Sequence, residues 1–155
     1  MTRLRYLREK YGMTQMQVQL ATGIDQSDYS KLENNINTIS FTQCKELALL
    51  FRTSMDFLAQ LTNEEKPHLR KNKWSNSASS DENLTRLQYL RNKHNMTQKQ
   101  VYEILDINQS NYSKIERGFR NMTYQQCKQF AMLYHTSMDY LAELTDDENA
   151  YLKND

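Results

Sequence analysis

Hydrophobic positions recur along this chain at the spacing of short amphipathic helices. In the first segment Leu4 and Leu7 fall on one helical face, and Thr2 stands where it can cap the helix. Thr14-Gln-Met-Gln17 has the spacing of a capping box, in which side chains and backbone N–H groups satisfy each other at a helix start. Continued through the first 66 residues, the pattern predicts five short helices and an all-α domain.

The whole pattern occurs twice. RLRYLREKYGMTQMQV, which starts at Arg3, is echoed by RLQYLRNKHNMTQKQV, which starts at Arg86, and about half of some 64 aligned positions are identical. We therefore expect two tandem five-helix domains, residues 1–66 (repeat 1) and 84–155 (repeat 2), joined by a flexible linker over residues 67–83. The linker holds the only proline and is rich in Ser and Asn. Two interpretations of Trp74 in this linker are equally consistent with the sequence: it docks on a neighbouring domain, or it has no particular role.

Further signals mark where helices start inside each repeat. The third helices are expected over residues 26–33 and 109–116. A Ser/Thr-x-x-Gln motif predicts the start of each fourth helix, and a Thr-x-x-Asp motif is expected to cap each fifth helix. These motifs are Ser40-x-x-Gln43 and Thr123-x-x-Gln126 for the fourth helices, and Thr53-x-x-Asp56 and Thr136-x-x-Asp139 for the fifth.

Three turns carry residues that tolerate a left-handed backbone, and the alignment places them at the same points of both repeats. Glycine adopts this conformation freely, and asparagine and aspartate tolerate it better than other residues. We expect a left-handed helix end at each position. The aligned pairs are Gly12 and Asn95, Gly23 and Asp106, and Asn35 and Gly118.

Composition excludes several classes of function. A quarter of the residues are charged, apolar runs are only a few residues long, and the N-terminus MTRLRYLREK lacks the apolar core of a signal peptide. We therefore expect a cytoplasmic protein without a membrane segment. Cys44 and Cys127 lie in apolar helical patterns without CxxC spacing, which predicts core residues and no metal site. No nucleophile–base set or phosphate-binding glycine loop is present, so neither catalysis nor a cofactor is expected.

From Thr14 to Glu33 the pattern predicts a helix, a tight turn at Gly23-Ile24-Asp25 and a second helix. This is a helix-turn-helix, whose second helix can lie in the major groove of DNA. With the flanking segments LRxLRxKxxxTQxxV…GIxQSxYSKLE and SMDFLAQL, each repeat resembles the Cro/repressor (XRE-type) helix-turn-helix family nearly end to end. The resemblance implies a repressor-like all-α fold and a transcriptional regulator that binds double-stranded DNA.

The resemblance also implies which side chains contact DNA. Gln15 and Gln98 match a glutamine that contacts phosphate and positions the recognition helix. Gln26 and Gln109 match the first recognition-helix position, where an amide can pair with N6 and N7 of adenine. The expected DNA-binding residues are Thr14, Gln15, Gln26, Ser27, Ser30 and Lys31 in repeat 1, and Thr97, Gln98, Gln109, Ser110, Asn111, Ser113, Lys114, Arg117 and Arg120 in repeat 2.

Other residues of the motif have structural or open interpretations. Tyr29 and Tyr112 are expected in the core, one helical turn from other apolar residues. Lys31 and Lys114 are as consistent with solvated side chains as with phosphate contacts. The resemblance also implies an ion pair between the first and third helices of each repeat, Arg8 with Glu33 and Arg91 with Glu116.

Charge is distributed unequally between the repeats. The net charge is only +1, but residues 86–135 hold eight Lys/Arg against three Asp/Glu, and residues 1–52 hold seven against five. After the recognition helix, repeat 2 carries Arg117 and Arg120 where repeat 1 has asparagines, and repeat 1 carries Asp28 within the helix itself. We expect repeat 2 to bind DNA more tightly, because cationic contacts to phosphate release counterions.

Two tethered domains can occupy two half-sites about one DNA turn apart. We therefore expect a repressor whose partner is an operator duplex with two similar half-sites. A flexible tether permits direct or inverted half-sites, and a homodimer or a protein partner stays open. The alternative is a protein-interaction module, such as an antitoxin, antirepressor or assembly scaffold, with weak or no specific DNA binding. Three observations favour that alternative: the near-neutral net charge, Asp28 in a recognition helix, and Gln19 and Tyr102 at the position where the family usually has a small alanine. The Gln-Ser start of both recognition helices opposes it.

Overall fold

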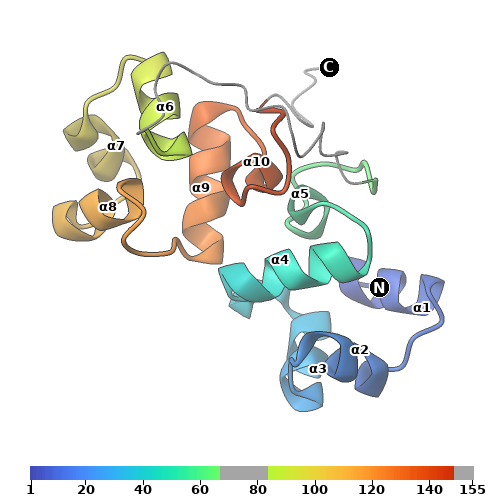
Figure 1. Ribbon diagram of the computed structural model, residues 1–155. Helices are drawn as coiled ribbons and strands as arrows, with labels where there is room; N and C mark the ends of the chain where they lie inside the picture. The colour runs from blue at the N-terminus through green and yellow to red at the C-terminus, as the bar shows by residue number, and fades with distance from the viewer. Residues whose placement is uncertain (67–83, 149–155) are drawn as a thin grey trace.

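The computed structural model describes residues 1–66 and 84–148, and every regular element in these ranges is helical (Figure 1). Repeat 1 consists of α1 (Arg3–Lys10), α2 (Gln15–Thr22), α3 (Gln26–Asn34), the 3-10 turn η1 (Ile36–Thr38), α4 (Phe41–Leu50) and α5 (Met55–Leu58). Repeat 2 consists of α6 (Arg86–Lys93), α7 (Gln98–Ile104), α8 (Gln109–Glu116), α9 (Tyr124–Tyr134) and α10 (Met138–Leu141). The predicted all-α fold is confirmed. The predicted linker over residues 67–83, with Trp74, lies outside the described residues.

The helix starts follow the sequence signals at the first, second and fourth helices of both repeats. At α2, Thr14 Oγ1 accepts a hydrogen bond from Gln17 N at 3.1 Å, and Gln17 Oε1 accepts one from Thr14 N at 2.8 Å. Capping boxes of the same kind begin α4, α7 and α9. Thr85 forms a further capping box with Gln88 at α6. The predicted caps are confirmed. They could be predicted because such bonds form between residues that are close in the sequence.

The fifth helices have different caps from those expected. The Thr-x-x-Asp motifs predicted Thr53 and Thr136 as the caps, but the N-caps are Ser54 and Ser137. The two threonine hydroxyls instead donate hydrogen bonds to the carbonyl oxygens of residues twelve positions farther along the chain. The Thr-x-x-Asp caps were therefore wrong, since a contact from outside the motif occupies each threonine.

The left-handed turns agree with the alignment at two of the three positions. The φ angles are +66° and +53° at Gly12 and Asn95, and +79° and +54° at Gly23 and Asp106. At the third position Gly118 has a φ of +83°, whereas Asn35 is extended with a φ of −154°. The Asn35 side chain accepts a hydrogen bond from Asn37 N at 3.0 Å and caps η1. The left-handed turn expected at Asn35 was wrong, and the segments after α3 and α8 follow different paths.

Each repeat encloses a core of aliphatic and aromatic side chains. Tyr29 and Tyr112 are fully buried, as predicted, and Cys44 and Cys127 are buried free thiols. Burial raises the pKa of both thiols, which keeps them protonated and unreactive near neutral pH. Across residues 1–66 and 84–148, no group of three His, Cys, Asp or Glu side chains could hold a metal ion, and no helix is long and apolar enough to cross a membrane.

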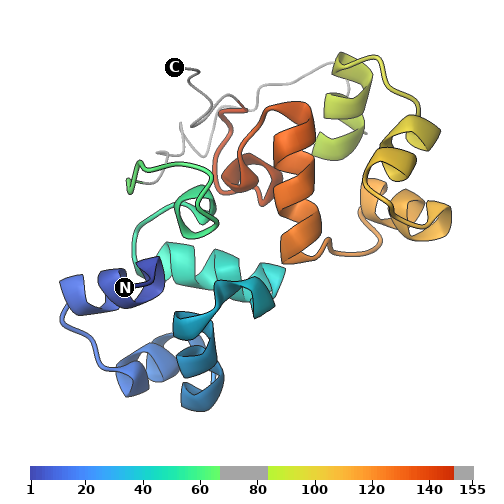
Figure 2. The same ribbon diagram turned by 180° about the vertical axis from the view of Figure 1, so that it is seen from behind.

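The two repeats pack against each other through α4 and α5 of repeat 1 and α9 and α10 of repeat 2 (Figures 1 and 2). Asp56 of α5 accepts hydrogen bonds from the backbone N of Met138 at 2.7 Å and of Asp139 at 3.2 Å. Asp139 in turn accepts one from Met55 N at 2.7 Å. Each aspartate therefore binds the start of the last helix of the other repeat. Such reciprocal contacts are typical of a two-fold interface, so the chain forms an internal pair.

Two grooves between the repeats are also related by the two-fold symmetry of the pair. One is lined by the first turns of α9 together with repeat 1 residues that include Asn35 and Gln60. The other is lined by the first turns of α4 together with the aligned residues Gly118 and Glu143 of repeat 2. Each repeat therefore presents the same surface to its partner, which extends the two-fold relation beyond the aspartates.

Candidate nucleic-acid interface

The α2–turn–α3 segment is a helix-turn-helix, and α7–turn–α8 is its counterpart in repeat 2. In repeat 1, Gly23 ends α2 in a left-handed conformation and Asp25 caps α3. Asp25 Oδ1 accepts hydrogen bonds from the hydroxyl of Ser27 at 2.6 Å and from its backbone N at 2.8 Å. These two bonds lower the pKa of the Asp25 carboxyl. The cap therefore fixes the first turn of α3 and holds the Ser27 hydroxyl against it.

A chain of polar side chains links α3 to α2 and α1. Gln26 Nε2 donates to Gln15 Oε1 at 3.4 Å, and Gln15 Nε2 donates to Glu33 Oε2 at 3.0 Å. Arg8 forms an ion pair with Glu33 and donates to Met13 O at 2.9 Å. Burial acts to raise the pKa of the Glu33 carboxyl, but the hydrogen bonds from Arg8 and Gln15 outweigh it and hold the pKa below its ordinary value. The predicted Arg8–Glu33 ion pair is confirmed.

Repeat 2 contains the same network around Glu116. Arg91 forms an ion pair with this carboxylate, which confirms the second predicted pair, and Gln98 donates a hydrogen bond to it. Tyr112 donates its hydroxyl to Glu116 Oε1 at 3.0 Å. Glu116 is fully buried, so side chains of α6, α7 and α8 converge on one buried carboxylate. In both repeats, polar side-chain contacts hold the recognition helix in addition to apolar packing.

The two side chains that replace the family's usual small alanine are both half-buried and remain in contact with the motif. Gln19 Oε1 accepts a hydrogen bond from Gln26 N at 2.8 Å, so it satisfies a free N–H group at the start of α3. The Tyr102 ring lies with its centroid 6.3 Å from that of Tyr112, tilted by 53°. Neither side chain turns away into solvent, and each supports the recognition helix in its own way.

None of the predicted DNA-binding residues is buried. The Gln-Ser pairs at the starts of α3 and α8 are exposed, and so are Arg117 and Arg120 after α8. The half-buried members of the set are Gln15, Ser30, Gln98, Asn111 and Ser113, and the others are exposed. Every side chain of the set is therefore at least partly open to solvent.

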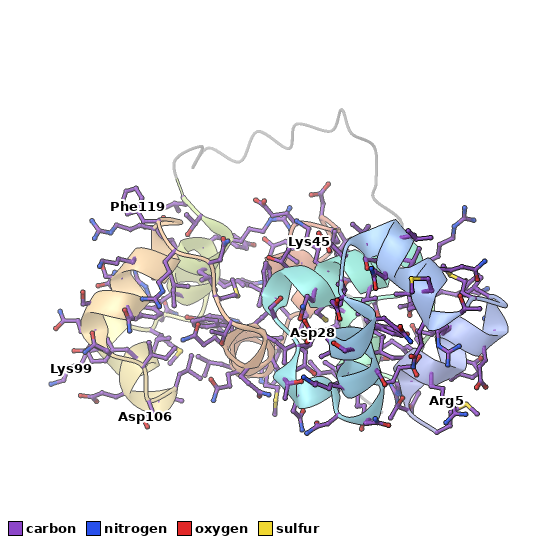
Figure 3. All side chains as sticks on the ribbon, turned by 90° about the horizontal axis from the view of Figure 1, so that it is seen from below. Arg5, Asp28, Lys45, Lys99, Asp106 and Phe119 are labelled. Carbon is purple, nitrogen blue, oxygen red and sulfur yellow. The ribbon has the colours of Figure 1, made fainter. Side chains whose placement is uncertain are left out.

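The recognition helices α3 and α8 lie on one side of the internal pair. In Figure 1, α8 lies at the left edge of the molecule and α3 at its lower end, and α5 and α10 lie on the other side of α4 and α9 from the open corner between them; Figure 2 shows the same arrangement from behind. Figure 3 shows Asp28 of α3 near the middle of the molecule and Phe119, just after α8, at its outer edge.

A family model for the helix-turn-helix matches residues 4–58 and again residues 87–141. The chain belongs to the XRE-type helix-turn-helix family. Each XRE-type repeat is accordingly a DNA-binding domain of the kind found in transcription regulators, in a family that is generally non-enzymatic. No curated protein and no solved structure matches the chain.

Two features of this XRE-type protein were missed from the sequence. Arg120 Nη1 donates to Asn111 Oδ1 at 2.8 Å, which joins the segment after α8 to the recognition helix. The alignment marked Arg120 as different from its counterpart but gave no direction for its side chain. The second feature is the pairing of the repeats through Asp56 and Asp139. Their signal was an acidic residue at the same place in two apolar segments.

Proposed function

We propose that this protein is a cytoplasmic transcriptional repressor that binds double-stranded DNA through both helix-turn-helix motifs at once. One observation carries the proposal: the two recognition helices, each with an exposed Gln-Ser start, lie on the same side of an internal pair held by reciprocal contacts. A single chain thereby supplies the two recognition helices that dimeric helix-turn-helix proteins supply from two chains.

The internal pair also supports two similar half-sites in inverted orientation. A two-fold relation between the recognition helices is matched by an operator whose halves have the same relation. Both recognition helices begin Gln-Ser and continue Tyr-Ser-Lys, so their half-sites should be similar. Because Asp28 aligns with Asn111, the half-sites should not be identical. The sequence left both orientations open, and the reciprocal packing favours the inverted one.

Gln26 and Gln109 are the proposed base-contacting residues. A side-chain amide presents a donor and an acceptor together, which matches N6 and N7 of adenine in the major groove. Gln15 and Gln98, at the starts of α2 and α7, are the proposed phosphate contacts, because helix N-termini favour anions. Phosphate contacts position the protein on the duplex and base contacts give it specificity.

Selection from random duplex DNA by the full chain, at two salt concentrations, tests this function. We expect enrichment of two related half-sites in inverted orientation. Gln26→Ala or Gln109→Ala should reduce the preference at one base pair of its own half-site by about tenfold or more. Binding at low salt should persist in both variants, since the phosphate contacts remain. Gln129→Ala, which removes an exposed glutamine of α9, is the matched control and should leave the enriched sequence unchanged.

Two other outcomes would change the conclusion. Salt-sensitive binding without any enriched sequence would reduce the protein to a nonspecific DNA binder. No binding at low salt would contradict the proposal and favour a protein-interaction module. One observation favours that alternative. Leu49 and Met132, aligned apolar residues of α4 and α9, are 60% and 61% exposed, and exposed apolar side chains can bind another protein.

A further inference from the structure

Asp28 and Asn111 occupy the same position of the two recognition helices and differ in hydrogen-bonding chemistry. Each follows the exposed Gln-Ser pair by one residue and lies in the first turn of α3 or α8. The Asp28 side chain is 61% exposed, and Asn111 is half-buried. An ionised carboxylate only accepts hydrogen bonds, whereas an amide offers both a donor and an acceptor. The two repeats therefore place different groups toward the same kind of ligand.

Arg120 orients the Asn111 amide. Its Nη1 donates to Asn111 Oδ1 at 2.8 Å, so the amide oxygen faces Arg120. Within residues 1–66 and 84–148, no hydrogen-bond acceptor contacts the Asn111 Nδ2 group. One of the two acceptor positions of the amide oxygen is thus filled and the oxygen is turned toward Arg120, while both N–H groups are left for a ligand. At this position repeat 2 presents a donor.

Repeat 1 has the opposite polarity. Asn37 aligns with Arg120, so repeat 1 has no arginine to cover the side chain at this position. The nearest cation to Asp28 is Lys31, whose Nζ lies 3.9 Å from Asp28 Oδ1, with both side chains largely exposed. An exposed pair at this distance is weak and leaves the carboxylate oxygens available. Repeat 1 therefore presents an acceptor where repeat 2 presents a donor.

We propose that Asp28 and Asn111 make the two operator halves differ at one base pair, where Asp28 selects cytosine and Asn111 selects guanine. Cytosine N4 donates to a carboxylate, whereas adenine adds an N7 acceptor beside its N6 donor and repels it. Guanine offers O6 and N7, two acceptors, to the Asn111 N–H groups, and the positive charge of Arg120 favours the same edge. The inference rests on the proposed DNA-binding function. It adds that the protein binds its operator in one orientation.

Asn111→Asp in the full chain tests the proposal by replacing the N–H donors with an acceptor oxygen of the same shape. Arg120 can still hold the other carboxylate oxygen. Operators selected by the unmodified protein should carry cytosine in one half and guanine at the equivalent position of the other. Operators selected by Asn111→Asp should carry cytosine in both, with a preference of about tenfold over guanine. Asn92→Asp, which adds the same charge to an exposed position of α6, should select the original sequence.

Arg120→Ala is a second test that does not depend on a new charge. Arg120 is exposed, so its loss leaves the core intact. The freed Asn111 amide can then pair with both N6 and N7 of adenine, and the guanine preference of that half-site should shift toward adenine. The same base in both halves of the original operator, or an unchanged base after Asn111→Asp, would overturn the proposal. Failure of the unmodified protein to enrich any sequence would instead contradict the proposed function, so the two failures are distinguishable.

Discussion

Arg5 and Arg8 lie on the same helix, and their ion pairs differ in burial. The Arg8 and Glu33 side chains are 16% and 6% exposed, whereas those of Arg5 and Glu9 are 58% and 43% exposed. Solvent screens the outer pair, so it contributes little to stability. A buried carboxylate that loses its cation is left unpaired, which costs several kcal/mol. The two arginines therefore form a matched comparison within α1.

Arg8→Met should lower the free energy of unfolding by about 3 kcal/mol, because Glu33 would keep a buried charge without its main partner. Arg5→Met should change it by less than about 0.5 kcal/mol. Urea denaturation of the full chain measures both values. A loss of the same size in the two variants would contradict the interpretation. Adding Glu33→Gln to Arg8→Met should recover part of the loss, since the unpaired charge is then removed.

At the scale of the elements, features set by neighbouring residues could mostly be predicted from the sequence, and most features set by distant contacts could not. The capping boxes at α2, α4, α7 and α9 were predictable because both partners stand three residues apart. Thr53 has the same local signal, but its hydroxyl is drawn to a carbonyl twelve residues away. Asn35 failed for a local reason of another kind, since its side chain caps η1 and holds its own backbone extended. The Arg8–Glu33 pair followed from a motif that fixes both residues, whereas an exposed arginine such as Arg120 has many rotamers and no such constraint.

The segment after α8 is the element on which unequal DNA binding by the repeats should depend. Arg117 and Arg120 are exposed there, and their counterparts in repeat 1 are Asn34, the last residue of α3, and Asn37 in η1. Replacing both arginines with alanine should weaken binding to the selected duplex at low salt and reduce the dependence of log K on log salt by about 2. A fluorescence anisotropy titration at several salt concentrations measures both effects. Replacing Asn34 and Asn37 with alanine is the control, and an equal loss in the two double variants would contradict tighter binding by repeat 2.

At the scale of the whole molecule, we expect Asp56 and Asp139 to make the stability of the junction between the repeats depend on pH. Burial raises the pKa of the Asp56 carboxyl to about 6, although backbone hydrogen bonds from Met138 and Asp139 oppose the shift. Burial, and then the nearby charge of Asp56, raise the pKa of Asp139 to about 7. Both groups bind their protons more tightly in the folded chain than in the unfolded chain. Their contribution to stability is therefore full below pH 4 and is lost as the pH rises through 6 and 7.

The free energy of unfolding should accordingly fall between pH 5 and pH 8 by about 3 kcal/mol more in the unmodified protein than in the Asp56→Asn, Asp139→Asn double variant. Asparagine keeps an acceptor oxygen for the backbone N–H groups but does not titrate. Denaturation curves at several pH values measure the difference. Asp106→Asn, at an exposed left-handed turn, should keep the original pH dependence. The same pH dependence in the double variant would exclude the two aspartates as its source.

The pairing of the repeats was beyond the sequence for a physical reason. Periodicity and capping motifs describe each repeat alone, and the surface that two domains share depends on how their shapes and buried polar groups match. The sequence placed Asp56 and Asp139 only in cap motifs, and the hydrogen bonds with the other repeat explain why each carboxylate is tolerated in a buried position.

The joining of both halves in one polypeptide changes how occupancy of a DNA site depends on the amount of protein. A two-chain regulator must first dimerise, so its active form falls off faster than its total concentration on dilution. Here the recognition helices stay together at any dilution, and occupancy of the site should rise with the first power of protein concentration, without a threshold. Because each half is encoded by its own stretch of one gene, a mutation can change one half and leave the other unchanged. Asp28 and Asn111 have already diverged in this way, a freedom that a homodimer made from one shared sequence lacks.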